Sequence, residues 1–267
     1  MNKTVAIAGM GWLGMPLAQH LKTLGFNIKG SVTKLDKATT LQKSGFDVYP
    51  VTISEDGIHG SVDAFLNNVT YLVVMIPPGL RRNTGSDYVL KMSHFLTEVE
   101  KSSVTHCIFI SSTSVYGNAQ GIVTEKDLPQ PENEAGRQLF QAEQLFFTSA
   151  CQTSIVRFGG LFGGNREPTR YLAGRENLSG AKAPVNLIHR KDCIQIISEI
   201  IKQQAFGHIF NAVHPDHPNK IEYYTKKAAA LGLKTPHFAQ PSAAEIFKQV
   251  DSVNVKALLD YTFSSRL

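Results

Sequence analysis

Three glycines near the amino terminus have the spacing of a phosphate-binding turn. Gly9, Gly11 and Gly14 lie in "VAIAGMGWLGMPLAQHL", where an apolar run ends and a helical pattern begins. In such a turn the first glycine permits the tight bend, the second lets a pyrophosphate approach the backbone, and the third lets helix and strand pack closely. Free N–H groups at the helix N-terminus attract the phosphates. The pattern predicts a dinucleotide site that also includes Trp12 and Leu13; a glycine-rich turn without a ligand is the alternative.

The end of the second apolar run bears on which dinucleotide is bound. An NAD site usually has Asp or Glu there, which holds the ribose 2′-hydroxyl. This chain has "GSVTKLDK", with Thr33 and Lys34 at the expected place and Asp36 two or three residues late. A hydroxyl and a cation suit a 2′-phosphate better than a carboxylate would. NADP is therefore favoured over NAD, unless Lys34 is only a solvated surface charge.

The order of the elements places these residues at one edge of a sheet. Short β-branched runs alternate with amphipathic helical segments, which predicts a doubly wound parallel sheet of the Rossmann type. Ligands bind at the carboxyl ends of such strands, so the cofactor site should also include Ile76, Pro77 and Ser111. Strands are expected at 4–9, 26–33, 46–53, 70–79, 106–112 and 153–160, and helices at 14–24 and 87–101.

The pattern becomes irregular after Gly163, which divides the chain into a nucleotide-binding domain, 1–163, and a mixed region, 164–267. The mixed region should contain a lid loop, return strands that complete the sheet, and a small α/β substrate-binding portion. We expect a short strand and a helix within 186–204 and a strand at 208–213. Helical segments are expected around 220–232 and 242–249.

Composition excludes several classes of protein. The net charge of +5 over 267 residues favours an anionic ligand but includes no Lys/Arg block suited to nucleic acid. The three cysteines form no C-x-x-C pair, so neither a disulfide framework nor a metal site is expected. The first strand leaves no room for a signal peptide, and no apolar run approaches ~20 residues. We expect a reduced, cytoplasmic protein with no membrane partner.

Several motifs, in order, resemble the extended short-chain dehydrogenase/reductase family, the NAD-dependent epimerase/dehydratase group. Besides the glycine turn they are "FISSTSVYGN", "AEQLF", "IVRFGGLFG", "NLIHRKDCIQII", "GHIFNAV" and "SVNVKALLDY". The resemblance covers nearly the whole chain. It implies redox or epimerase/dehydratase chemistry on a nucleotide-linked sugar or a similar small molecule. It leaves a homodimer open.

The family's catalytic Tyr-x-x-x-Lys pair is absent. Counted from the "AE" of "AEQLF", the Tyr position falls at Ala135 and the Lys position at Leu139. With Ala142 and Phe146 they form one apolar helix face, because residues i and i+4 share a face. Ala and Leu cannot exchange protons, so this face either packs or lines an apolar pocket. Whether the chain is an enzyme is left open.

Other groups remain as candidates for the active site. Counted back from "VYG", Ser112 matches the family's catalytic Ser/Thr, or else caps a turn or contacts the nicotinamide ribose. Tyr116 is either a relocated acid/base or a packed turn residue. Arg166 and Tyr171 in the expected lid, and His189 in "IHRKD", are the substrate-binding candidates. His189 has a suitable pKa, with a structural role as the alternative.

Two other functions stay open. A dinucleotide sensor without catalysis accounts for the missing pair. The segment "GMGWLGMPLA" also resembles the β-hydroxyacid-type dehydrogenases. Such a protein would have a largely helical second domain, and the strand-like later segments argue against one.

Overall fold

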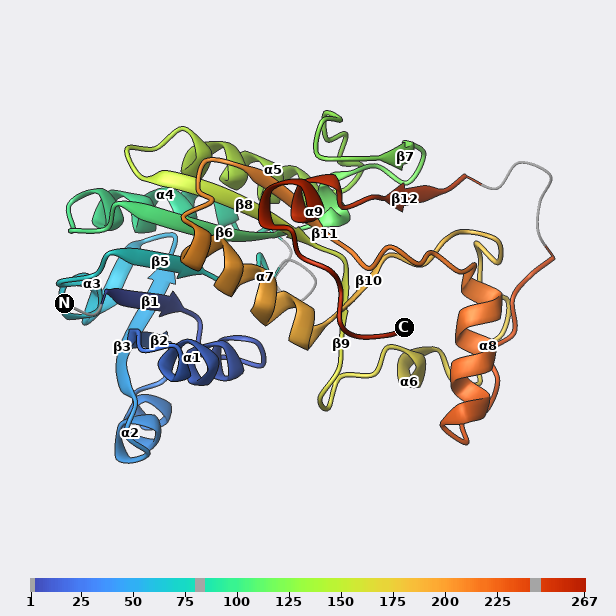
Figure 1. Ribbon diagram of the computed structural model, residues 1–267, viewed down its shortest axis with the longest axis horizontal. Coiled ribbons are helices and arrows are strands. Elements are labelled where there is room, and N and C mark those ends of the chain that lie inside the picture. Colours follow the sequence, from blue (N-terminus) through green and yellow to red (C-terminus); the bar gives the residue numbers. More distant parts are fainter. Residues whose placement is uncertain (1–2, 80–84, 241–245) are drawn as a thin grey trace. The chain divides into compact units, whose positions relative to one another are not determined.

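The computed structural model describes residues 3–79, 85–240 and 246–267 (Figure 1). These form two compact units that interleave along the chain. The first unit consists of Met1–Ser112, Asn133–Val156 and Ile197–Ile209, and the second of Thr113–Glu132, Arg157–Ile196 and Phe210–Leu267. The sequence-based division after residue 163 treats the parts as consecutive, whereas the compact units exchange segments.

An eight-stranded sheet in the described residues has the order β11-β8-β6-β5-β1-β2-β3-β4. The neighbours from β3 through β6 pair in parallel, and β4 pairs antiparallel with β3. The strands are β1 (Thr4–Ala8), β2 (Asn27–Val32), β3 (Asp47–Ser54), β4 (Gly57–Gly60), β5 (Tyr71–Val74), β6 (His106–Ser112), β8 (Gln152–Phe158) and β11 (Ile209–Ala212). The predicted strands and the predicted fold class are confirmed.

The strand order fixes where a ligand would bind. The chain runs from β1 outward through β2 to β3, and then returns to β5 on the other side of β1 before it continues to β6. The direction of winding therefore reverses between β1 and β5. In open α/β sheets this switch point opens a crevice at the carboxyl ends of the strands. The residues that follow β1 and β5 thus meet at the expected place.

Helices connect the strands of the first unit. They are α1 (Gly14–Thr23), α2 (Leu35–Lys43), α3 (Val62–Leu66), α4 (Tyr88–Glu100) and α5 (Glu134–Phe147), while α7 (Arg190–Gln203) runs from the second unit into the first. Side-chain caps start two of them. Asp87 accepts a hydrogen bond from the N–H of Leu90 at 2.8 Å, and Asn133 accepts one from Gly136 at 2.9 Å. These caps satisfy N–H groups that have no partner inside the helix.

The core of the first unit lies around its central strands. Every residue of β5 is buried, as are Val5–Ala8 of β1. Continuous burial is typical of parallel strands that are covered on both faces. No helix among the described residues is long and apolar enough to cross a membrane.

The second unit combines short strands and helices. Two parallel strand pairs form it, β7 with β12 and β9 with β10. Its elements are β7 (Gly121–Val123), β9 (Gly160–Phe162), α6 (Thr169–Leu172), β10 (Leu187–His189), α8 (Lys220–Ala230), β12 (Lys248–Val250) and α9 (Val253–Leu259). Glu125 accepts hydrogen bonds from the N–H groups of Asn211, Val253 and Asn254, and so ties the start of α9 to β11. This mixture of strands and helices differs from the largely helical domain of the β-hydroxyacid alternative.

One predicted helix is wrong in its described part. The segment around 242–249 was expected to be helical; residues 241–245 lie outside the described residues, and Lys248–Val250 form strand β12. Pairing decides this outcome, because Lys248 lies opposite Gly121 and Val250 opposite Val123. The Asn186 side chain adds hydrogen bonds to the backbone at Lys248 and Val250, both 2.8 Å long.

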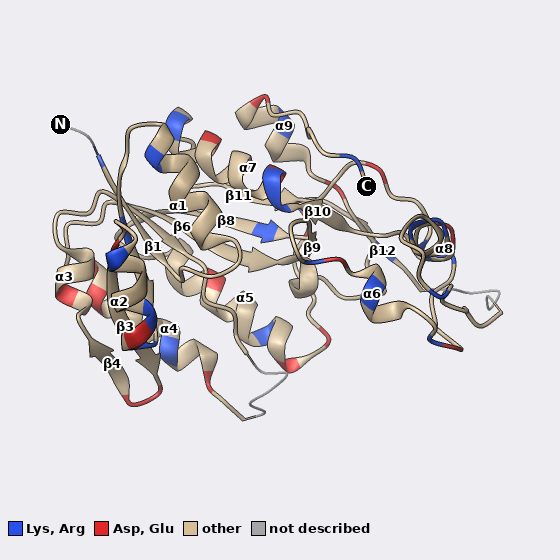
Figure 2. Ribbon diagram, turned by 90° about the horizontal axis from the view of Figure 1, so that it is seen from below, with Lys and Arg blue, Asp and Glu red and all other residues tan. Residues whose placement is uncertain are grey.

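Charged residues of both signs are distributed over the described elements. Figure 2 shows Lys and Arg interspersed with Asp and Glu along the elements of both units. This distribution agrees with the mild net charge of +5.

Candidate functional site

The glycine turn is held in shape by backbone contacts to β2 and β5. Gly9 has a φ of +113°, and a Cβ there would lie 2.9 Å from the carbonyl oxygen of Met75. The N–H of Met10 donates to the carbonyl of Ser31 at 2.9 Å, and Gly11 donates to Gly9 at 2.8 Å. Only glycine adopts this backbone at Gly9 without strain. The turn is therefore built for a fixed shape.

Gly11 and Gly14 have different surroundings. A Cβ at Gly14 would lie 2.2 Å from the carbonyl oxygen of Gly9, so this glycine is required for α1 to pack against the turn. Apart from Gly11 and its two chain neighbours, no described protein atom lies within 4 Å of the position that a Cβ at Gly11 would take. The protein itself therefore does not require glycine at position 11. A group that approaches the backbone from outside would, and a dinucleotide pyrophosphate fits that description.

A cavity of about 300 Å³ opens beside the turn. It brings together Gly9, Gly11, Thr33, Ile76 and Pro77 from the predicted cofactor residues. Its other lining residues are Met10, Ser31, Val32, Lys37, Val51, Ile53 and Met75. The predicted cofactor residues Trp12, Leu13, Gly14, Lys34 and Ser111 do not line it. The volume and the largely apolar wall are typical of a small-molecule site.

Lys37 is a lining residue that the sequence analysis missed. It lies in the first turn of α2, and its ammonium donates to the carbonyl oxygen of Met10 at 2.9 Å. Lys34, which the sequence favoured, lies at the N-cap of α2 and does not line the cavity, although both lysines are exposed. Helical spacing could have pointed to Lys37, because it lies three positions after Lys34 and therefore on the same side of the helix.

The apolar face of α5 packs in the core of the first unit. Leu139, Ala142 and Phe146 are buried, and Ala135 is half-buried. The rings of Phe146 and Phe109 of β6 have centroids 4.8 Å apart. Of the two alternatives for this face, packing is the one that the described contacts support.

The same helix carries a carboxylate that the sequence analysis did not select. Glu143 is 1% exposed, and it accepts a hydrogen bond from the hydroxyl of Ser111 at the end of β6. Its position four residues after Leu139 places it on the buried face, where a polar residue is unusual. Ser111 is therefore held by α5, while Ser112, the next residue, is half-buried at the end of β6.

Tyr116 belongs to the second unit and is 1% exposed. Its phenol oxygen lies 3.0 Å from the carbonyl of Thr124, 3.0 Å from Oδ1 of Asn211 and 2.7 Å from Nη1 of Arg157. Burial raises the pKa of Tyr116, although the Arg157 charge opposes the shift. This environment favours the packed turn residue over the relocated acid/base.

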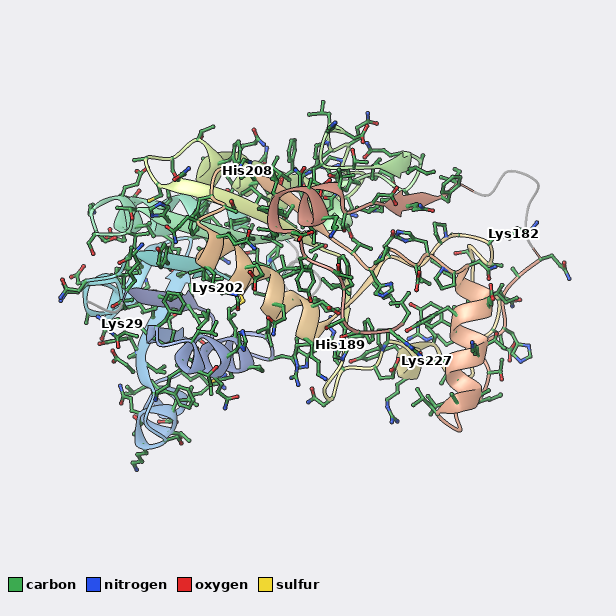
Figure 3. The ribbon with its side chains drawn as sticks, viewed as in Figure 1. Lys29, Lys182, His189, Lys202, His208 and Lys227 are labelled. Carbon is green, nitrogen blue, oxygen red and sulfur yellow. The ribbon has the colours of Figure 1, made fainter. Side chains whose placement is uncertain are left out.

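The three substrate-binding candidates take different places in the second unit. Tyr171 on α6 is 68% exposed. Arg166 pairs its backbone with Gly163 in a tight turn. His189, labelled with Lys227 of α8 in Figure 3, lies at the end of β10 and packs edge-on against Phe162 with centroids 5.0 Å apart.

The surroundings of His189 fix its ring. Its Nδ1 accepts from the N–H of Lys191 at 3.2 Å and lies 3.0 Å from the hydroxyl of Ser265. A Cβ at Gly163 would lie 2.4 Å from Nε2. Burial lowers the pKa of His189, and the carboxylate of Asp192 works against that shift. No group of three or more His, Cys, Asp or Glu side chains that could hold a metal ion is found among the described residues.

The chain is similar to a known protein in sequence and to several solved structures in fold. No protein-family model matches it. Protein YeeZ of Escherichia coli (strain K12) is 36% identical over 242 residues, which are 88% of this chain and 86% of that protein. Several solved structures share the fold at low identity. UDP-glucose 4-epimerase of Thermotoga maritima, with UDP-glucose, has a TM-score of 0.80 at 13% identity, and covers 98% of this chain and 94% of its own.

UDP-glucuronic acid 4-epimerase of Bacillus cereus, in complex with NAD, has a TM-score of 0.79 at 16% identity, and covers 98% of this chain and 92% of its own. The agreement with YeeZ extends over most of both chains, whereas the solved structures share the architecture alone. The chain therefore belongs to the family of Protein YeeZ and has the fold of the NAD-dependent epimerases/dehydratases of the short-chain dehydrogenase/reductase superfamily.

Proposed function

We propose that the chain binds NADP, or less favourably NAD, through its first unit and transfers hydride to or from a nucleotide-linked sugar or a similar small molecule. The observation that carries this proposal is the glycine turn beside the cavity. Gly11 leaves open space for a pyrophosphate, and Thr33, Ile76 and Pro77 border a slot for the adenosine. The bound NAD and UDP-glucose of proteins with the same fold support the ligand classes.

The pyrophosphate would lie over Gly9, Gly11 and Gly14, with Trp12 and Leu13 at the start of α1. The N–H groups of a first helical turn have no partner inside the helix and attract anions. The bound dinucleotide would donate the hydride in its reduced form or accept it in its oxidised form. From the resemblance we assign Ser112 the orientation of the substrate oxygen. Arg166, Tyr171 and His189 remain the proposed substrate contacts, and a homodimer remains a prediction that light scattering tests.

Trp12 provides the test of cofactor binding, because it is the only tryptophan and lies inside the glycine turn. NADPH and NADH are titrated against its fluorescence. We expect both to change the signal, NADPH at the lower concentration. A folded protein that responds to neither cofactor contradicts the proposal.

Catalysis needs a separate test. NADPH absorbance is followed with a panel of nucleotide sugars and carbonyl compounds. We expect turnover that falls in Ser112→Ala while cofactor binding persists. Turnover that survives this change removes Ser112 from the mechanism.

A second candidate function is a dinucleotide sensor without catalysis. It is favoured by the packing of Leu139 and by the hydrogen bonds that hold Tyr116. In that case NADPH changes the pattern of limited proteolysis, and no compound in the panel supports turnover. Measured turnover on any member would exclude it.

A further inference from the structure

We propose that Lys37 is the residue that distinguishes NADPH from NADH in this chain, by binding the 2′-phosphate of the adenosine ribose. The inference rests on the proposed cofactor site and adds to it a determinant that lies inside a helix. The two residues that the sequence offers at the end of β2 do not supply this charge in the cavity, since Thr33 is neutral and Lys34 does not line it.

The ammonium of Lys37 is held against the glycine turn. Lys37 donates to the carbonyl oxygen of Met10 at 2.9 Å, and Met10 is the residue between the first two glycines of the turn. The side chain of Met10 is 1% exposed and packs over Gly30, where a Cβ would lie 2.5 Å from its Cγ. The ammonium is thus held against the turn by a backbone carbonyl, at the cavity wall.

Among the described lining residues, Lys37 is the only charged side chain, and no carboxylate lines the cavity. Asp36 is exposed and is not a lining residue. A ribose 2′-hydroxyl in an NAD site is normally held by a carboxylate, whereas a 2′-phosphate needs a cation. The charge of this wall therefore suits the phosphate.

The ammonium of Lys37 has hydrogen-bond donors left for a phosphate. An ammonium has three donors, and the contact with Met10 uses one of them. Two donors remain for phosphate oxygens without loss of the contact that positions the side chain. Charge-assisted hydrogen bonds of this kind are stronger than neutral ones. Thr33 adds a hydroxyl to the same wall.

The test compares dissociation constants of NADPH and NADH, measured by Trp12 fluorescence, for the natural protein, Lys37→Met, Lys37→Arg and Lys34→Met. Methionine keeps an unbranched stem of similar length and removes the charge. We expect Lys37→Met to weaken NADPH binding about 10- to 100-fold and NADH binding by less than about 3-fold. The dissociation constant of NADH divided by that of NADPH should therefore fall toward one. Lys37→Arg should retain most of the preference, and Lys34→Met should leave the ratio unchanged.

Three outcomes would overturn the inference. Equal weakening of both cofactors in Lys37→Met would show that Lys37 only holds the turn through Met10. If the NADPH preference is lost in Lys34→Met instead, the phosphate is assigned to Lys34. If the natural protein binds both cofactors with equal affinity, there is no preference for Lys37 to produce and the inference fails, while the proposed cofactor site stands. If the folded natural protein binds neither, the proposed function fails first, and this inference fails with it.

Discussion

The phenol oxygen of Tyr116 lies 2.7 Å from Nη1 of Arg157, and both side chains are 1% exposed. The guanidinium carbon also lies 5.1 Å from the centroid of the tyrosine ring, a cation–π distance. Thr124 and Asn211 provide acceptors for the single phenol proton. A tyrosine held in this way joins three segments of the second unit. We therefore expect Tyr116 to contribute mainly to the stability of that unit.

Tyr116→Phe should therefore lower stability more than it lowers catalysis. The change removes a hydrogen-bond partner from buried polar groups, which typically costs about 1–3 kcal/mol. Chemical denaturation measures the free energy of unfolding. Tyr171→Phe is the matched control, because that side chain is exposed and should change stability by less than about 0.5 kcal/mol. A large loss of turnover in Tyr116→Phe without a loss of stability would restore the acid/base interpretation.

Alanine at the two later glycines of the turn should separate folding from cofactor binding. Gly14→Ala places a Cβ 2.2 Å from the carbonyl of Gly9, and this overlap should cost about 1–3 kcal/mol or more. Gly11→Ala meets no described protein atom within 4 Å and should leave the melting temperature nearly unchanged. It should still weaken NADPH at least about 10-fold, because the methyl group occupies the approach of the pyrophosphate. Unchanged affinity in Gly11→Ala would place the phosphates elsewhere.

Leu139 tests whether the former lysine position is now core. Leu139→Lys buries a charge at a site that is 4% exposed, and should destabilise the protein by at least about 2 kcal/mol. Leu139→Met, nearly equal in volume, should cost less than about 1.5 kcal/mol. Both values come from urea unfolding. If lysine is tolerated as well as methionine, the side chain reaches solvent or a cofactor, and the packed interpretation is wrong.

Acid should remove the contribution of His189 to stability. Its pKa is lowered in the folded chain, chiefly by burial, so folding favours the neutral ring. The resulting stability is fully present above the unfolded value of about 6.5 and is lost as the pH falls through the lower folded pKa. The destabilisation caused by His189→Gln should be larger at pH 7.5 than at pH 5. The difference should stay below about 1 kcal/mol, because the ring is only half-buried. An equal cost at both pH values would contradict this.

Periodicity and glycine spacing were sufficient for the sheet and for the glycine turn. Alternation of short apolar runs with helical segments located six strands between Thr4 and Phe158, because this pattern depends on residues close together in the chain, but it missed the short strands β4 and β7. The same reasoning misplaced a helix at Lys248–Val250, where pairing with β7 overrides local propensity. It also placed one boundary after residue 163, although the compact units exchange segments.

The sequence by itself determined the Rossmann-type order of elements and the glycine turn, and it predicted that Ala135 and Leu139 stand at the family's Tyr and Lys positions. Only the tertiary structure placed Lys37 rather than Lys34 at the cavity wall, brought Ser111 to Glu143 and surrounded the hydroxyl of Tyr116 with hydrogen-bond partners. These contacts link residues 27, 32 and 41 positions apart. Spacing along the chain does not encode such distances. They arise when the sheet brings its strand ends together and each helix turns one face toward them.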